Sequence, residues 1–158
     1  MSDIPALIKG CLDNRAHCEV LAVPAFLISF PLFWIFVVTL ISRMGWHALA
    51  ERFPAGDRVT EGESFSMQSL LIGRATRYKN CVGVTAAYDG MGLSVMFLFR
   101  PAHPPLFIPW SEIEAVEDKQ TFLFNCLALK IRNFDKELML WGSSRDAVRK
   151  AYDSSRGK

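Results

Sequence analysis

The clearest feature of the hydrophobic pattern is a long run of apolar residues without a charge near the start of the chain. Residues 20–41 read VLAVPAFLISFPLFWIFVVTLI, with Glu19 and Arg43 as the nearest charges on either side. A helix needs about 20 apolar residues to cross a bilayer core. A buried helix of a soluble protein is rarely apolar on every side over such a length. The pattern therefore predicts a transmembrane helix over residues 20–42.

A cleaved signal peptide is the alternative interpretation of this run, because the tripeptide Ala48-Leu49-Ala50 resembles a cleavage site. The run is longer than the roughly 7–15 apolar residues of a signal-peptide core. Arg43 and Trp46 also stand between the run and the tripeptide. We therefore expect the segment to be retained as an anchor, with Trp46 at the membrane interface.

Shorter helical patterns flank the predicted span. Residues 1–19 place apolar side chains at helical spacing and predict an amphipathic segment that lies on the membrane or on a partner. Residues 43–63 predict a juxtamembrane interfacial helix followed by a polar linker. Two basic residues precede the span, and three follow it up to residue 60. This bias predicts that the C-terminal part lies in the cytoplasm.

From residue 64 the pattern changes from helical to strand-like. Short apolar runs between turn residues predict about seven strands, and Asp89-Gly90 is a strong hairpin signal. The chain then returns to helix, where Ser143 and Asp146 resemble a capping box. An apolar stripe follows at Ala147, Val148, Ala151 and Tyr152. The fold class predicted is α+β, mostly β, with a small barrel closed by a C-terminal helix.

Two short motifs in this region are AYDGMGLSV (residues 87–95) and FIPWSEIEAV (residues 107–116). With the order of elements, they resemble the pleckstrin-homology-like (PH-like) superfold, in particular bacterial PH-like domains attached to membrane helices. The resemblance covers about residues 64–155 and implies a PH-like domain over residues 64–158. It also implies a bacterial inner-membrane protein, in a family whose domains bind lipid headgroups, peptides or nothing yet identified.

The candidate ligand residues are Arg74, Arg77, Tyr78 and Lys79, in a polar stretch between the first two expected strands at 65–73 and 81–88. In PH domains that bind phosphoinositides, basic residues of the first hairpin loop hold phosphates, so the resemblance implies headgroup contact here. The order of basic residues differs from the usual one, because Lys79 ends the run. The alternative is a solvated hairpin loop.

The stretch RPAHPPLFIPW, at residues 100–110, follows a third expected strand over residues 91–99. Pro101, Pro104 and Pro105 predict a stiff corner. Pro109 predicts an edge or a bulge, because proline cannot donate to a sheet ladder. His103 is expected to be an exposed residue of that corner. Phe107 and Trp110 supply apolar surface either to the core or to a partner, which makes them candidate partner-surface residues.

Composition and motifs mainly exclude functions. A net charge of +2 does not indicate nucleic-acid binding. The cysteines form no C-x-x-C pair and have no histidine at zinc-finger spacing, so we expect free thiols, no metal and no cofactor. No nucleotide-binding or hydrolase motif is present, and no histidine has an obvious reactive partner in the sequence. We therefore expect a protein that is not an enzyme.

Together these features predict a single-pass, membrane-anchored PH-like binding or scaffolding module. Its expected partners are the lipid bilayer, anionic headgroups, and another membrane protein or a second copy of itself. The alternative is a structural or assembly subunit, or a small membrane protein that neutralises a toxin, acting through its membrane helix and domain surface.

Overall fold

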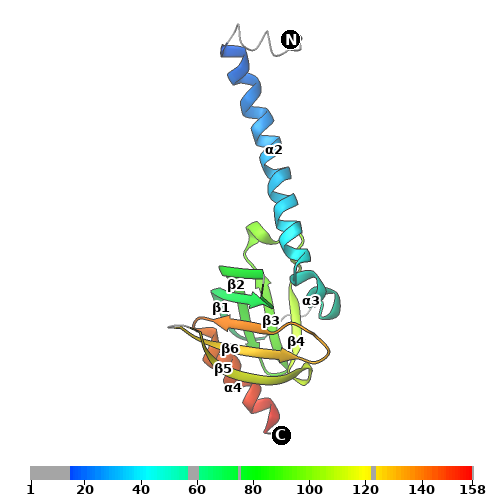
Figure 1. Cartoon of the computed structure of the whole chain (residues 1–158), viewed down its shortest axis with the longest axis vertical. Helices are drawn as coiled ribbons and strands as arrows, with labels where there is room; N and C mark the ends of the chain where they lie inside the picture. Colours follow the sequence, from blue (N-terminus) through cyan, green and yellow to red (C-terminus); the bar gives the residue numbers. More distant parts are fainter. Residues whose placement is uncertain (1–14, 57–60, 75, 122–123, 158) are drawn as a thin grey trace. The chain divides into compact units, whose positions relative to one another are not determined.

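The computed structural model describes residues 15–56, 61–74, 76–121 and 124–157 (Figure 1). The segment expected to be amphipathic, residues 1–19, lies largely outside this part of the chain. The chain divides into two compact units, one ending at Val37 and one beginning at Val38. Each is described separately.

The first unit contains most of helix α2, Arg15–Arg43. The segment Ala22–Arg43 of α2 is long and apolar enough to cross a membrane. Large apolar side chains such as Phe26 and Phe33 are exposed along it. The prediction of an N-terminal apolar helix of membrane-spanning length is therefore confirmed.

The second unit is built on a curled antiparallel sheet in the order β4-β3-β2-β1-β7-β6-β5. Strand β1 pairs with β2 along its whole length and with β7 only over Ser69–Ile72, and register shifts near Gln68 bend it. The sheet is followed by helix α4, as predicted, so the α+β, mostly β, fold class is confirmed. The strands are β1 Gly62–Ile72, β2 Thr76–Ala87, β3 Gly90–Val95, β4 Leu106–Pro109, β5 Ile113–Thr121, β6 Phe124–Ile131 and β7 Leu138–Trp141, and α4 is Ser144–Arg156.

A short helix before the sheet, α3 (Trp46–Arg52), belongs to this unit and to its core. Trp46, Leu49 and Phe53 are buried in the same apolar cluster as residues of the strands and of α4. The Trp46 indole donates a hydrogen bond to the carbonyl of Pro104 at 2.9 Å. The expectation that Trp46 anchors the chain at a membrane interface is therefore wrong, because no part of its side chain is exposed.

Strand β2 begins at Thr76, earlier than expected, so most of the polar stretch before Cys81 is strand rather than loop. The side chains of Thr76 and Tyr78 are buried, and those of Arg77 and Lys79 are exposed. This alternation is the period of a strand with one buried face. The high polarity of the stretch concealed the pattern.

Strand β3 ends earlier than expected, at Val95, and residues Phe97–Phe99 form a 3-10 turn, η1. Strand β4 pairs with Gly90–Leu93 of β3, and the backbone leaves the sheet after Val95. The chain turns at this point into the proline-rich corner.

Helix α4 buries Val148 and Tyr152 against the sheet, so the predicted apolar stripe is confirmed. The predicted capping box is not formed, because Ser143 makes no side-chain cap hydrogen bond and Asp146 pairs with Arg145. The first turn is capped instead by Gln68 of β1, whose Oε1 accepts hydrogen bonds from the backbone N–H and the hydroxyl of Ser144, both at 3.1 Å.

Candidate functional site

The β1–β2 hairpin, which carries Arg74, packs against the turn that ends α2. Its Gly73 lies beside Lys136, whose ammonium donates to the carbonyl of Met44 at 3.1 Å. A methyl group placed on Gly45 would lie 3.0 Å from the side chain of Ile72. Arg74 directly follows Gly73 in this hairpin, and its side chain is exposed.

Arg77 and Lys79 project from the same exposed face of β2. The guanidinium of Arg77 lies 5.6 Å from the ring centroid of Trp141, which is within cation–π range. The two cations line a groove of about 360 Å³ together with Trp141 and the exposed side chains of Met67 and Phe124. Positive charge beside exposed apolar surface suits an anionic amphiphile such as a phospholipid.

Tyr78 points away from these cations and into the core, where it is only 4% exposed. Its hydroxyl lies 2.9 Å from Nε2 of His103. Burial raises the pKa of the Tyr78 phenol, so the group is protonated near neutral pH. The structure thus brings Arg77 and Lys79 together and separates Tyr78 from them.

His103 is buried, with 1% of its surface exposed, and the expectation of an exposed loop histidine is wrong. Its Nδ1 lies 3.3 Å from the carbonyl of Pro101, and its ring packs on Trp46. Burial lowers the pKa of the imidazole, so the neutral form is favoured. In that form Nδ1–H donates to Pro101 and Nε2 accepts from Tyr78. No sequence signal marked this pair, because its members are far apart in the chain.

Phe107 and Trp110, the candidate partner-surface residues, both lie inside the domain. The Trp110 indole donates to the carbonyl of Ala87 at 3.0 Å, and its ring meets that of Tyr152 edge-on. Phe107 forms a small buried cluster with Ala55 and Ala87. Both side chains support the fold and offer little exposed area to a partner.

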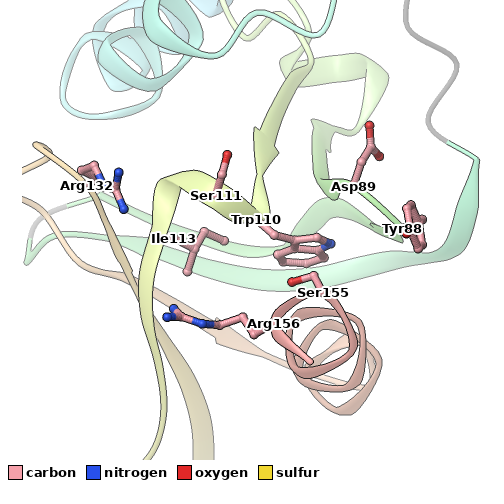
Figure 2. Close-up of a pocket in the computed structure, with 8 residues that line it drawn as sticks. All are labelled: Tyr88, Asp89, Trp110, Ser111, Ile113, Arg132, Ser155 and Arg156. Atoms are coloured by element: carbon pink, nitrogen blue, oxygen red, sulfur yellow. The ribbon is translucent and has the colours of Figure 1, made fainter. Parts of the chain in front are cut away.

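A pocket of about 530 Å³ opens between the β2–β3 turn, the start of β5 and the end of α4 (Figure 2). Arg132 and Arg156 reach it from different elements, and one guanidinium nitrogen of Arg156 is fixed by donation to the Tyr152 hydroxyl at 2.7 Å. The pocket therefore has mixed charge, with two guanidinium groups and the carboxylate of Asp89 among its lining groups. The lining residues are Tyr88, Asp89, Trp110, Ser111, Ile113, Arg132, Ser155 and Arg156.

Among the residues that the structure describes, no group of three His, Cys, Asp or Glu side chains could hold a metal ion. Burial raises the pKa of the partly buried Cys81 thiol, which disfavours a reactive thiolate.

Comparison with family models finds no match for the sequence, and comparison with curated proteins finds no relative. Among solved structures, the chain is similar to the Vps36 N-terminal PH domain, with a TM-score of 0.48 and 11% identity, over 61% of this chain and 80% of that one. It is also similar to the C-terminal domain of an unknown protein from Leishmania infantum, with a TM-score of 0.46 and 16% identity, over 61% of this chain and 83% of that one. These are likenesses of fold alone.

Proposed function

We propose that the protein is a single-pass, membrane-anchored PH-like binding module that contacts anionic headgroups of its own bilayer through Arg74, Arg77 and Lys79. It has no enzymatic activity. The carrying observation is the position of the β1–β2 hairpin, which packs against the Met44–Gly45 turn directly after the apolar segment Ala22–Arg43.

The domain core supports a retained anchor over a cleaved signal sequence. Cleavage after Ala50 would remove Trp46 and Leu49, two side chains with no exposed surface. Truncating a buried tryptophan or leucine to alanine costs about 2–5 kcal/mol each. Domains are stable by only about 5–15 kcal/mol, so the loss of both residues would leave little stability. The membrane of the proposal is a bacterial inner membrane, and the charge bias of the flanks supports an orientation with the domain in the cytoplasm.

Weak individual contacts are sufficient for such a module. Each cation near an anionic leaflet contributes about 1 kcal/mol. The anchor keeps the domain at a high effective concentration next to the lipid, so three such contacts favour an oriented domain over a freely rotating one. Lipids with a negative headgroup are therefore the expected ligands of the hairpin.

Hydrogen exchange of the full chain in lipid nanodiscs tests this proposal. We expect residues 73–80 to exchange more slowly in discs that contain phosphatidylserine than in discs of phosphatidylcholine alone. The Arg74→Ala/Arg77→Ala/Lys79→Ala variant should lose this difference. The matched control, Lys130→Ala/Arg145→Ala/Lys150→Ala, removes the same charge elsewhere and should keep it. Equal exchange of the wild type in both discs at low salt would refute headgroup contact.

One observation favours the second candidate function, assembly through the membrane helix. Phe26 stacks on Phe30 with ring centroids 5.4 Å apart, and Phe30 stacks on Trp34 at 6.5 Å. These rings form one stripe along α2, which suits packing against another helix. Crosslinking in native membranes decides the matter: an oligomer lost in the Phe26→Leu/Phe30→Leu/Trp34→Leu variant supports assembly, and a monomeric wild type rejects it.

A further inference from the structure

The turn after β3 exposes large apolar side chains at the surface of the domain. We name residues Met96–Arg100 the apolar corner. Phe97 is 72% exposed and Leu98 is 49% exposed. Large apolar groups gathered at one exposed turn are typical of interaction sites.

The apolar corner is fixed to the end of helix α2. The Ser42 hydroxyl donates a hydrogen bond to the carbonyl of Ala102, two residues after the corner. The backbone N–H of His103 donates to the carbonyl of Arg100 at 2.9 Å, and the His103 ring packs on Trp46. These residues all belong to the C-terminal unit, so the position of the corner beside Ser42 is a property of that unit.

The position of Ser42 in the chain indicates what covers the apolar corner. Ser42 and Arg43 are the last residues of the segment that is long and apolar enough to span a bilayer. If that segment crosses, its charged end at Arg43 lies at the headgroup level, because a charge inside the hydrocarbon core is costly. Ala102, two residues after the corner, is hydrogen-bonded to Ser42, one residue before this point, and this bond places the corner close to the same level.

The composition of the corner also matches an anionic membrane surface. Residues 90–111 contain no acidic side chain, and Arg100 is their only lysine or arginine. Aromatic and aliphatic side chains with a neighbouring arginine are the residues that enter the boundary between headgroups and acyl chains. The apolar side chains Leu40 and Met44, on the last turn of α2 and just after it, are also exposed.

We infer that the apolar corner inserts into the headgroup–acyl boundary of the bilayer that α2 crosses, as a second membrane contact of the domain. This inference rests on the proposed anchoring function of α2. The two contacts together restrict rotation of the domain about the helix. They hold the β1–β2 hairpin, which packs on the same α2–α3 junction, next to the headgroups.

Photocrosslinking of the full chain in nanodiscs tests the inference. Benzoylphenylalanine replaces one aromatic residue at a time: Phe97 in the corner, Phe33 in the apolar helix, or Tyr88. Tyr88 is 75% exposed and lies at the opposite end of β3 from Phe97, so it is a matched control. We expect lipid adducts at positions 33 and 97 and at least a tenfold lower yield at position 88. All three side chains are exposed, and thermal unfolding of each substituted chain confirms the fold.

The outcomes separate this inference from the proposed function. Lipid adducts at position 33 with none at position 97 overturn the membrane contact of the corner and leave the anchor in place. Capture of a second copy of the chain at position 97, without lipid, also overturns it. Absence of adducts at position 33 refutes the anchor itself, and the inference falls with it.

Discussion

At the scale of single residues, a buried aromatic cluster connects three segments that are distant in the sequence. Trp46, Tyr78 and His103 lie with ring centroids 5.5–5.6 Å apart, and the Tyr78–His103 hydrogen bond lies among them. Trp46 follows the end of α2, Tyr78 lies on β2, and His103 belongs to the proline-rich corner. The cluster therefore holds the β1–β2 hairpin and the proline-rich corner next to the end of α2.

The lowered pKa of His103 predicts that acid destabilises the domain. The unfolded chain takes up a proton on this histidine near its ordinary pKa of 6.5, whereas the folded chain resists protonation. The contribution of His103 to stability is thus fully present above pH 6.5 and decreases as the pH falls below it.

Denaturant unfolding in detergent, repeated from about pH 7 to pH 5, measures this effect. The wild type should lose more unfolding free energy over this range than His103→Gln, whose amide still accepts a hydrogen bond from Tyr78 and does not titrate. Equal pH dependence of the two chains would show that His103 is protonated as easily in the fold as outside it.

At the scale of elements, α4 is joined to the sheet by a hydrogen-bonded cap from β1. Met67 adopts a left-handed backbone conformation in the irregular part of β1, and the next residue, Gln68, is buried. The Gln68 amide accepts from Ser144 and donates to the carbonyl of Ser66 at 2.8 Å. Gly142 has a φ of 119°, and a side chain there would collide with Gln68. The start of the helix thus depends on strand β1.

We expect Gln68→Ala to lower the unfolding free energy by about 1–2 kcal/mol, because it leaves the buried N–H and hydroxyl of Ser144 without their acceptor. Ser143→Ala, at the position that the sequence marked as the cap, should lower it by less than Gln68→Ala does, because it removes only the 3.3 Å hydrogen bond from the Gln68 amide, which keeps its bond to the carbonyl of Ser66. Urea titration of both variants gives the two values. A larger loss of unfolding free energy for Ser143→Ala than for Gln68→Ala would show that Ser143, and not Gln68, caps the helix.

Features that depend on residues close together in the sequence could be predicted. The apolar run, the hairpin signalled by Asp89-Gly90 and the stripe of Val148 and Tyr152 depend on spacings between near neighbours, and each is found in the structure, although the hairpin turns at Tyr88 and Asp89 and Gly90 already belongs to β3. Features that depend on distant partners could not be predicted. The cap on α4 comes from Gln68, which is 76 residues away from Ser144.

The candidate site shows the same limit. Lysine and arginine next to a hairpin were visible in the sequence, so Arg74, Arg77 and Lys79 could be proposed as exposed cations. Tyr78 lies between two of them, and only pairing with β1 shows that it faces the core.

At the scale of the whole molecule, the domain and the end of the apolar helix belong to one folded unit. The C-terminal unit begins at Val38, inside α2, and takes Trp46, Leu49 and Phe53 into its core. The sequence suggested a separate interfacial helix here, because an amphipathic helix has the same apolar spacing whether it faces a membrane or a sheet. A folded domain of this kind requires that the chain after Arg43 is retained.

Alkaline extraction of membranes from cells that express the full chain, followed by intact-mass measurement, tests the central claim most directly. The account predicts a protein that stays in the membrane pellet after alkaline washing, is released only by detergent, and has the mass of residues 1–158 with or without the initiator methionine. A protein released by the wash, or one whose mass lacks the residues before position 51, would contradict the anchor.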